Sequence, residues 1–354
     1  MNYHGFEVFF LFLNNADSIL IRHYNQGVKT VILVDGGRKK HTPIVRRFLL
    51  DLGENELHHL VCSHHHEDHA GGLVELVGDR TLAIRKAWVH LGDLLVDRID
   101  HSRFQAFGSL LRRAQASKET QKELVTALLN RGITPEEPFA VAQVGPLLVV
   151  SPTREFYNAQ LELIRQEAVA KALNDRYQER DTRARMEAIG FTKPAEEDAE
   201  DDGELGAETT SPENEISTVL LLPSAGADGV TMNFLLTADA GTAALADLKA
   251  RSENAKSLLK AVRWMQLPHH GSRRNLNVDL LDYYKPETGF VSAEGSKKHP
   301  SVKLVNAIKE RKGRVYSTHY PPEKTEGYWL RQTDGLVPDL KTTPAVPLWD
   351  KASS

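Results

Sequence analysis

The stretch that decides the fold is His64-His65-His66-Glu67-Asp68-His69, and it contains the pattern His-x-His-x-Asp-His. Imidazole and carboxylate side chains together suit zinc, manganese or iron rather than a metal that prefers thiolates. The pattern offers enough ligands for two metal ions. A histidine tract that served only solubility would have no reason to carry an aspartate at its fifth position.

The flanking residues place this motif at the end of a strand. Residues 57–62 are mostly apolar and hold no helix breaker, which predicts a buried strand. Residues 70–73 are Ala-Gly-Gly-Leu, which predicts a tight turn into a helix. Ligands at a strand end are held by a rigid element, and the loop lets alternate side chains converge on one cavity.

The composition is that of a soluble globular protein. The 354 residues are 41% hydrophobic and can form one large domain or two smaller ones. The longest apolar run near the start, Val8 to Leu13, is too short to cross a bilayer, and no basic segment precedes it as in a signal peptide. Cys62 is the only cysteine, which excludes an internal disulfide, and we expect it to pack as a small apolar residue. These features predict a cytoplasmic protein.

Charge is distributed unevenly along the chain, whose net charge is −4. Residues 196–215 contain ten Asp or Glu and no Lys or Arg. Without this stretch the chain has 44 basic and 38 acidic side chains, a net charge of +6. A basic body with an acidic segment is compatible with a polyanionic substrate. Scattered Lys and Arg that only keep the protein soluble would explain the charge equally well.

Hydrophobic periodicity predicts strands and helices that alternate in two halves. The predicted strands are 7–13, 18–23, 30–35, 57–62, 139–151, 217–222, 233–237, 264–267, 289–292 and 314–317. The predicted helices are 44–52, 161–189, 241–262 and 302–312, with a helical hairpin over 94–130. The acidic residues 194–212 predict disorder, and the residues from 334 a tail. We expect two sheets packed face to face with helices outside and a site along one edge.

Three further clusters of polar side chains follow predicted strands. Residues 235–240 are apolar up to Asp239, although a lone aspartate at such a place is usually a helix cap. Residues 267–272 carry His269 and His270, and residues 297–300 form the basic loop Lys-Lys-His-Pro. Together with the histidine motif and the two arginines that follow residue 272, these clusters hold all of the candidate site residues.

Taken in order, the clusters resemble the metallo-β-lactamase superfamily, and most closely the hydrolase domain of ComEC-type competence proteins. The resemblance rests on residues 64–72, 214–217, 235–239, 268–272 and 299–300, and on the Asp-Gly-Gly turn at 35–37. It implies an αββα sandwich, in which two mixed sheets are packed together with helices outside. Residues 1–157 and 214–330 would form the hydrolase domain, 158–213 a helical and acidic insertion, and 331–354 a C-terminal tail.

The chain departs from the superfamily's pattern at three places. A Gly-Gln-Gly-Asp turn is replaced by Asn14-Asn15-Ala16-Asp17, and residues 158–213 have no counterpart. The wider superfamily also places a metal-ligating histidine after the strand predicted at 139–151, where this chain has Ser151-Pro152-Thr153. The competence-type subgroup resembles this chain in that lack. One metal site would then have one ligand fewer, and water or a substrate oxygen would complete it.

The resemblance implies a role for each candidate residue. His64 and His66 would hold one divalent ion, Asp68 and His69 the second, with Asp239 bridging and His270 as the late ligand. Two cations, zinc or manganese, roughly 3.5–4 Å apart would lower the pKa of a shared water. Asp68 would accept or orient the proton of that water, and His269 would meet the substrate.

The basic residues near the same edge are candidates for holding phosphate oxygens. They are Arg273, Arg274, Lys297 and Lys298, with Ser272 beside them. Exposed basic residues are more often only solvated. His299 either donates a proton to the leaving group or caps the helix that follows it.

These features predict a metal-dependent hydrolase, a phosphodiesterase or nuclease acting on nucleic acid. The superfamily also contains lactonases, thioesterases, phosphocholine esterases and sulfatases, so a small-ester or cyclic-nucleotide hydrolase is an alternative. Another is a partner-regulated effector subunit of a bacterial defence or DNA-uptake system, in which residues 158–213 dock a protein. The acidic run could also occupy the basic site and hold it inactive.

Overall fold

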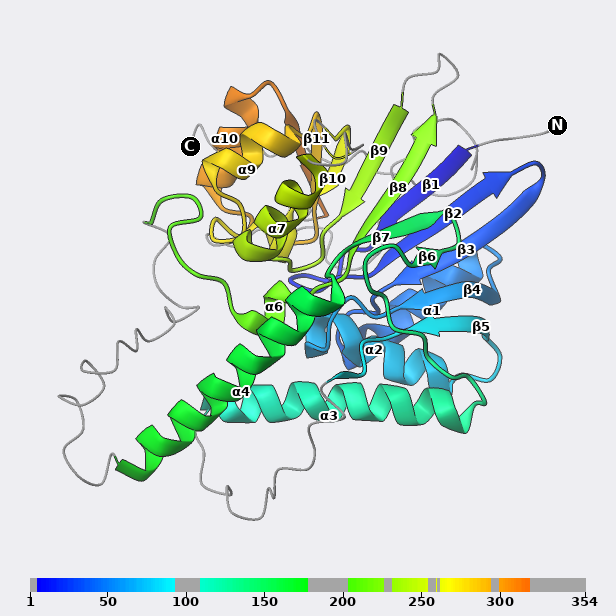
Figure 1. Ribbon diagram of the computed structural model, residues 1–354. Coiled ribbons are helices and arrows are strands. Elements are labelled where there is room, and N and C mark those ends of the chain that lie inside the picture. The colour runs from blue at the N-terminus through cyan, green and yellow to red at the C-terminus, as the bar shows by residue number, and fades with distance from the viewer. Residues whose placement is uncertain are drawn as a thin grey trace, which may run out of the picture.

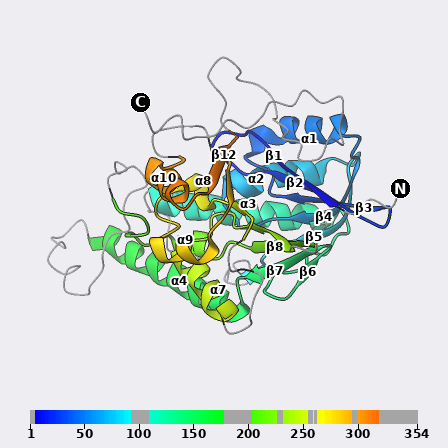
Figure 2. The same ribbon diagram turned by 90° about the horizontal axis from the view of Figure 1, so that it is seen from above.

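The computed structural model describes residues 5–92, 109–177, 203–225, 231–253, 259, 262–293 and 299–318. Two mixed sheets lie face to face, and helices cover their outer sides (Figures 1 and 2). The predicted αββα sandwich is thereby confirmed. Within the described residues, no helix has the length and apolar character needed to cross a membrane.

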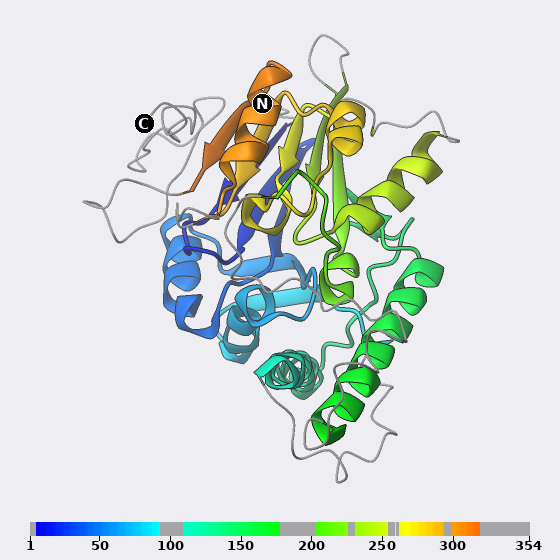
Figure 3. The same cartoon turned by 90° about the vertical axis from the view of Figure 1, so that its left-hand side faces the viewer.

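The first sheet is built from the N-terminal part of the chain. Its five strands, in spatial order, are β1 (Gly5–Phe10), β2 (Ile19–Asn25), β3 (Val28–Val34), β4 (Glu56–Val61) and β5 (Ala83–Trp88). Its outer side is covered by α1 (Thr42–Asp51), α2 (Glu67–Gly78) and α3 (Ser109–Asn130), the last seen nearly end-on in Figure 3. Side chains alternate between the faces of a strand, so Leu20 packs under the helices while Ile21 faces the other sheet.

The second sheet contains the remaining strands. Its spatial order is β12 (Arg314–Ser317), β11 (Thr288–Val291), β10 (Trp264–Gln266), β9 (Thr231–Leu236), β8 (Val219–Ala225), β7 (Leu147–Ser151) and β6 (Gln143–Val144). The helices α7 (Thr242–Glu253), α9 (Val278–Tyr284) and α10 (Val302–Glu310) pack on its outer face. Two short helices lie in loops at the site, α6 (Pro212–Glu215) and α8 (Pro268–Gly271), and the 3-10 helix η1 (Lys39–His41) precedes α1.

Two local predictions are wrong, each because a glycine has a role that its neighbours in sequence do not reveal. The strand predicted at 139–151 is a hairpin of β6 and β7, which turns at Gly145 with φ +59°. The predicted Gly71-Gly72 turn lies inside α2, which begins at Glu67. A Cβ at Gly72 would clash with the carbonyl oxygen of Gly36, so these glycines let the first loop approach the helix.

The region predicted as an insertion is partly described. The helix α4 (Arg154–Tyr177) begins seven residues before the predicted helix 161–189, because Thr153 Oγ1 accepts a hydrogen bond from the Phe156 amide at 3.1 Å. Its Tyr157, Leu161 and Ile164 pack with Phe139 and Ile216 in a small apolar cluster. Residues 203–211, predicted to be disordered, lie against the site. The boundaries at 158 and 213 stay a prediction.

Other predicted segments lie wholly or partly outside the described residues. These are residues 93–108 of the predicted helical hairpin, 178–202 of the long helix and acidic run, 254–258 after α7, and the predicted tail. Lys297 and Lys298, two of the predicted substrate-binding residues, also lie outside the described residues.

Candidate metal centre

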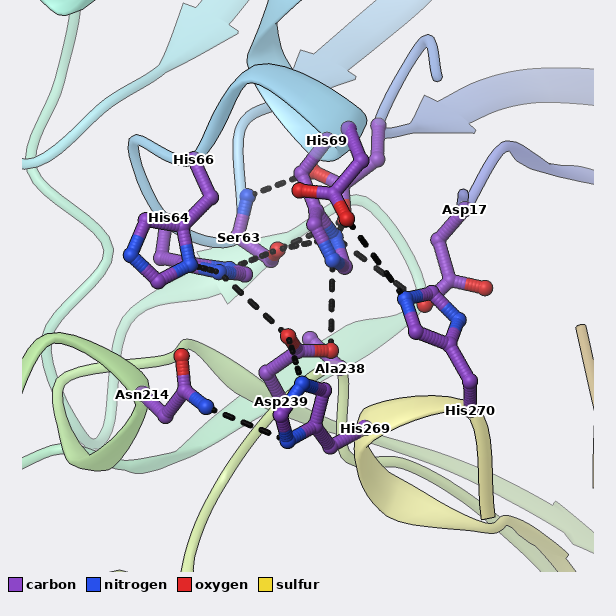
Figure 4. A network of polar contacts seen from close by, with 12 residues as sticks. Asp17, Ser63, His64, His66, His69, Asn214, Ala238, Asp239, His269 and His270 are labelled. Carbon is purple, nitrogen blue, oxygen red and sulfur yellow. Dashed lines mark hydrogen bonds and ion pairs between the residues drawn. The ribbon is translucent and has the colours of Figure 1, made fainter. Parts of the chain in front are cut away.

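The candidate ligands come from loops that follow strands of both sheets. Of three groups whose ligand atoms lie within 4.8 Å of one another, two contain only predicted ligands: a first cluster of His64, His66 and Asp239, and a second cluster of Asp68, His69 and His270. The fold therefore brings together all six residues that the sequence predicts as metal ligands. Figure 4 shows Asp239 between the two clusters.

Asp239 presents one carboxylate oxygen to each cluster. Its Oδ2 lies 3.7 Å from His64 Nε2, and its Oδ1 lies 3.2 Å from His69 Nε2. The side chain is buried and follows β9, so it cannot turn away into solvent. Helix capping, the usual role of such an aspartate, falls to Glu215, which accepts hydrogen bonds from the Ala243 and Ala244 amides at 3.2 and 2.7 Å.

The Nδ1 atoms of His64, His69 and His270 are held by neighbouring groups, so that their Nε2 atoms point into the centre. His69 Nδ1 donates to Asp35 Oδ2 at 2.8 Å, and His270 Nδ1 donates to the Ser292 carbonyl oxygen at 2.9 Å. His64 Nδ1 lies 3.2 Å from Ser63 Oγ, which itself donates to Asp35. This arrangement is typical of metal-binding histidines, because it leaves a lone pair on Nε2.

The two imidazoles of the first cluster are neutral. Burial lowers the pKa of His64 well below its ordinary value, and it lowers the pKa of His66 to about 4. Their nitrogens, His64 Nε2 and His66 Nδ1, approach to 3.0 Å. Neutral imidazole is the form that binds a metal ion.

In the second cluster, protonated imidazoles lie next to ionised carboxylates. Burial alone would lower the pKa of both histidines, but Asp239 raises that of His69 well above its ordinary value. The Asp68 carboxylate, whose Oδ2 lies 3.7 Å from His270 Nε2, likewise contributes to raising the pKa of His270 to about 9. The carboxyls of Asp68 and Asp239 have pKa values held below the ordinary range, since the imidazoles outweigh the effect of burial. A divalent ion would replace these protons as the partner of the carboxylates.

Several buried polar atoms at the centre lack a hydrogen-bond partner among the described residues. They are His69 Nε2, His270 Nε2, Asp239 Oδ1 and Asp17 Oδ1. His69 Nε2 and Asp239 Oδ1 face each other as an ion pair at 3.2 Å, without the geometry of a hydrogen bond. An unsatisfied buried polar group costs about 1–3 kcal/mol, so these atoms would gain from a further partner. Nitrogen and oxygen donors in this number fit a pair of divalent cations.

Three residues at the centre were not assigned a role from the sequence. Asp17 forms a third possible ligand group with His69 and Asp239, and its Oδ2 accepts a hydrogen bond from Gln266 at 3.1 Å. Asp35 orients His69, and Asn214 contacts the ring of His269. Asp35 begins the Asp-Gly-Gly turn on which the resemblance partly rests, and Asp17 ends the turn that departs from the superfamily's pattern. Neither turn indicates the contacts that these carboxylates make.

The predicted substrate-binding residues have different surroundings. Arg273 and Arg274 both pair with Glu208, Nη2 to Oε1 and Nε to Oε2, each at 2.6 Å. Ser272 Oγ accepts a hydrogen bond from the Arg274 amide at 3.2 Å. The ring of His299 lies 5.7 Å from that of His269. The N-cap of α10 is Ser301, so His299 is not its cap.

Comparison with known proteins supports the fold. Residues 12–133 match the family model described as the metallo-beta-lactamase superfamily. Together with the two mixed sheets, this match shows that the chain has the metallo-β-lactamase fold. No curated protein sequence matches the chain.

Several solved structures are similar to the chain at low identity. Metallo-beta-lactamase SMB-1 bound to 2-mercaptoethanesulfonate is 13% identical with a TM-score of 0.33, and the match covers 73% of this chain and 79% of that one. The hydrolase AbOPH is 11% identical with a TM-score of 0.37, covering 90% and 76%. A long form RNase Z from yeast is 11% identical with a TM-score of 0.35, covering 94% and 39%. TM-scores this low carry no information on the substrate, and the ComEC-type resemblance stays a prediction.

Proposed function

From a metallo-β-lactamase fold whose strand ends carry two adjoining ligand clusters, we propose that this chain is a metal-dependent hydrolase that cleaves phosphodiester bonds of nucleic acid. The observation that carries the proposal is the position of Asp239, which presents Oδ2 to His64 and Oδ1 to His69. A carboxylate that faces two ligand clusters is suited to join two cations.

Two divalent cations in these clusters would supply the positive charge that activates water and stabilises the attacking and leaving oxygens of an in-line displacement. The residues of the chain hold the cations and orient the reacting groups. Asp68 is the carboxylate of the centre that reaches solvent, with 21% of its side chain exposed, and it can accept or orient the proton of the attacking water. Arg38 Nη2 lies 3.3 Å from Asp68 Oδ2, which restricts the direction of this carboxylate.

A phosphodiester is favoured over a neutral ester by the arginine pair that follows the His269-His270 turn. Arg273 and Arg274 hold one carboxylate, that of Glu208, through two charge-assisted contacts of 2.6 Å. A phosphate presents similar oxygens and could take the place of this carboxylate. The acidic segment would then compete with a polyanionic substrate for the same guanidinium groups.

The direct test uses metal-free protein with Mn²⁺, Zn²⁺ or Mg²⁺ added back separately. The substrates are single- and double-stranded DNA, RNA, bis(p-nitrophenyl) phosphate, a cyclic nucleotide and a lactone. We expect cleavage of at least one nucleic acid and of the chromogenic diester, and only after metal is restored. Activity on the lactone or the cyclic nucleotide alone would replace the proposal by the small-molecule alternative, and metal-independent turnover would overturn it.

Removing the charge of Glu208 tests whether the arginine pair binds a polyanion. We expect Glu208→Gln to tighten the binding of a single-stranded oligonucleotide by about three- to tenfold at low salt, because it removes the carboxylate that competes with phosphate for two guanidinium groups. The gain should shrink as salt is raised, since screening weakens the contacts of phosphate with arginine. Fluorescence anisotropy with a labelled oligonucleotide measures both effects.

The matched control is Glu204→Gln in the same segment. Glu204 contacts Arg273 through its carbonyl oxygen, at 3.4 Å, so the substitution removes a charge and leaves the arginine pair in place. Equal gains in both variants would indicate a general charge effect. Weaker binding in Glu208→Gln, together with a lower melting temperature, would mean that Glu208 only stabilises the fold.

A further inference from the structure

The first cluster has only two nitrogen ligands. The superfamily that the chain resembles places one more metal-ligating histidine after the strand that corresponds to β7. No histidine follows β7, where the chain has Ser151, Pro152 and Thr153. Thr153 is used in capping α4, and Ser151 is buried within the sheet. The first cluster therefore contains two imidazoles and one oxygen of Asp239, which leaves a position for another donor.

The ring of His269 lies beside that position. Its Nε2 is 3.8 Å from Asp239 Oδ2, the same oxygen that lies 3.7 Å from His64 Nε2. Figure 4 shows His269 and His64 approaching Asp239 from different sides. The distance is too long for a hydrogen bond between ring and carboxylate, but it fits two ligands that share one cation.

The backbone around His269 is held in an unusual conformation that produces this placement. His269 and His270 are consecutive residues in the left-handed region, with φ +49° and +54°. Such backbone is uncommon outside glycine and persists where the surroundings impose it. The His269 amide donates to the Ala238 carbonyl oxygen at 3.0 Å, which ties this turn to the loop that carries Asp239.

The other nitrogen of His269 repeats the pattern of its neighbours. Its Nδ1 lies 3.2 Å from the side-chain amide of Asn214, just as the Nδ1 atoms of His64, His69 and His270 lie against Ser63, Asp35 and Ser292. Asn214 is 4% exposed, and its Oδ1 has no hydrogen-bond partner among the described residues.

A half turn of this amide would exchange the positions of its oxygen and its nitrogen. Oδ1 of Asn214 would then accept a hydrogen bond from His269 Nδ1, which gives the orphaned oxygen a partner. The Nε2 atom of His269 would carry a lone pair, as a metal ligand requires.

We propose that His269 is a third nitrogen ligand at the first cluster, in the place of the histidine that is absent after β7, and that Asn214 is its positioning residue. The inference rests on the proposed function only in that the clusters hold metal ions. It gives His269 a role other than the contact with substrate that the sequence predicts.

The test measures metal affinity directly, by calorimetric titration of the metal-free full-length protein with Zn²⁺ and Mn²⁺. His269→Ala should weaken the binding of one of two ions by at least about 100-fold and leave the other unchanged, and Asn214→Ala should weaken the same ion by about 10- to 100-fold. His299→Ala removes a neighbouring imidazole, 5.7 Å from the ring of His269, that belongs to neither ligand cluster, and it should leave both affinities unchanged. Pulsed electron paramagnetic resonance of the Mn²⁺-loaded protein should show one bound imidazole nitrogen fewer in His269→Ala.

Asn214→Asp separates the proposed hydrogen bond from a structural role. An aspartate accepts from Nδ1 as Asp35 does for His69, so this variant should retain the wild-type affinity even if His269→Ala fails to fold. Loss of affinity equal to that of Asn214→Ala would overturn the orientation we assign. Two ions bound with wild-type affinity in His269→Ala would overturn the ligand itself. A wild-type protein that binds no divalent ion would instead overturn the proposed function.

Discussion

Asp239→Ala is expected to remove both metal ions and to abolish hydrolysis. The carboxylate is 1% exposed and presents Oδ2 to the first cluster and Oδ1 to the second, so its loss takes one ligand from each. Replacing a residue that belongs to only one of the two clusters would instead empty one site. Elemental analysis of the purified variant measures the metal content, and the chromogenic diester measures turnover, which we expect to fall by at least about 1,000-fold.

Glu215→Gln is the control for Asp239→Ala. Glu215 is also a buried carboxylate close to this loop, but it binds the amides at the start of α7 instead of either cluster. Its substitution should lower the free energy of unfolding by about 1–2 kcal/mol without changing the metal content. If Asp239→Ala kept one full equivalent of metal, the carboxylate would serve one cluster alone.

Asp68→Ala and His69→Ala are expected to empty the second cluster while the first keeps its ion. Both residues lie in the first turn of α2, and neither contributes to the group formed by His64, His66 and Asp239. Turnover should fall by about 1,000-fold or more in Asp68→Ala, because the variant loses a cation and the carboxylate that handles the proton of water. Metal analysis and diester hydrolysis, with circular dichroism to establish folding, measure these effects.

Glu67→Ala provides the matched control in the same helical turn. Glu67 pairs with Arg38 at 2.7 Å, as Asp68 does at 3.3 Å, but it belongs to neither ligand group among the described residues. Metal content should therefore be unchanged. Two ions retained in both Asp68→Ala and His69→Ala would contradict the assignment of the second cluster.

Local pattern predicted most of the elements because periodicity reports which face of a strand or helix is buried. The predicted strand 314–317 agrees with β12, and the predicted helix 44–52 agrees with α1 to within two residues at its start. The pattern failed at Gly71-Gly72, where the glycines serve a close approach to Gly36. A rule based on neighbouring residues assigns a glycine pair to a turn. It does not reveal that the glycines make room for backbone that is distant in sequence.

For the basic residues too, the local sequence indicates their place in the chain but not their contacts. The sequence indicates that Arg273 and Arg274 lie near the site, since they follow the His269-His270 turn directly. It does not indicate that both pair with Glu208, which lies 65 residues away from Arg273 in the chain. A low content of apolar residues predicts disorder for an acidic segment, and only the tertiary contact shows that part of it is held against the arginines.

By itself, the sequence determined the fold class and the six candidate ligands, because ligand type and spacing are local properties of the strand ends. The resemblance also implied which ligands share an ion and that Asp239 lies between them. Only the tertiary structure decided that Asp35 and Asn214 contact the imidazoles. These contacts join loops of two different sheets, as in the hydrogen bond between Asp17 and Gln266, which are 249 residues apart. Their geometry depends on strand order and on how the sheets pack, and neither is encoded in any short stretch of residues.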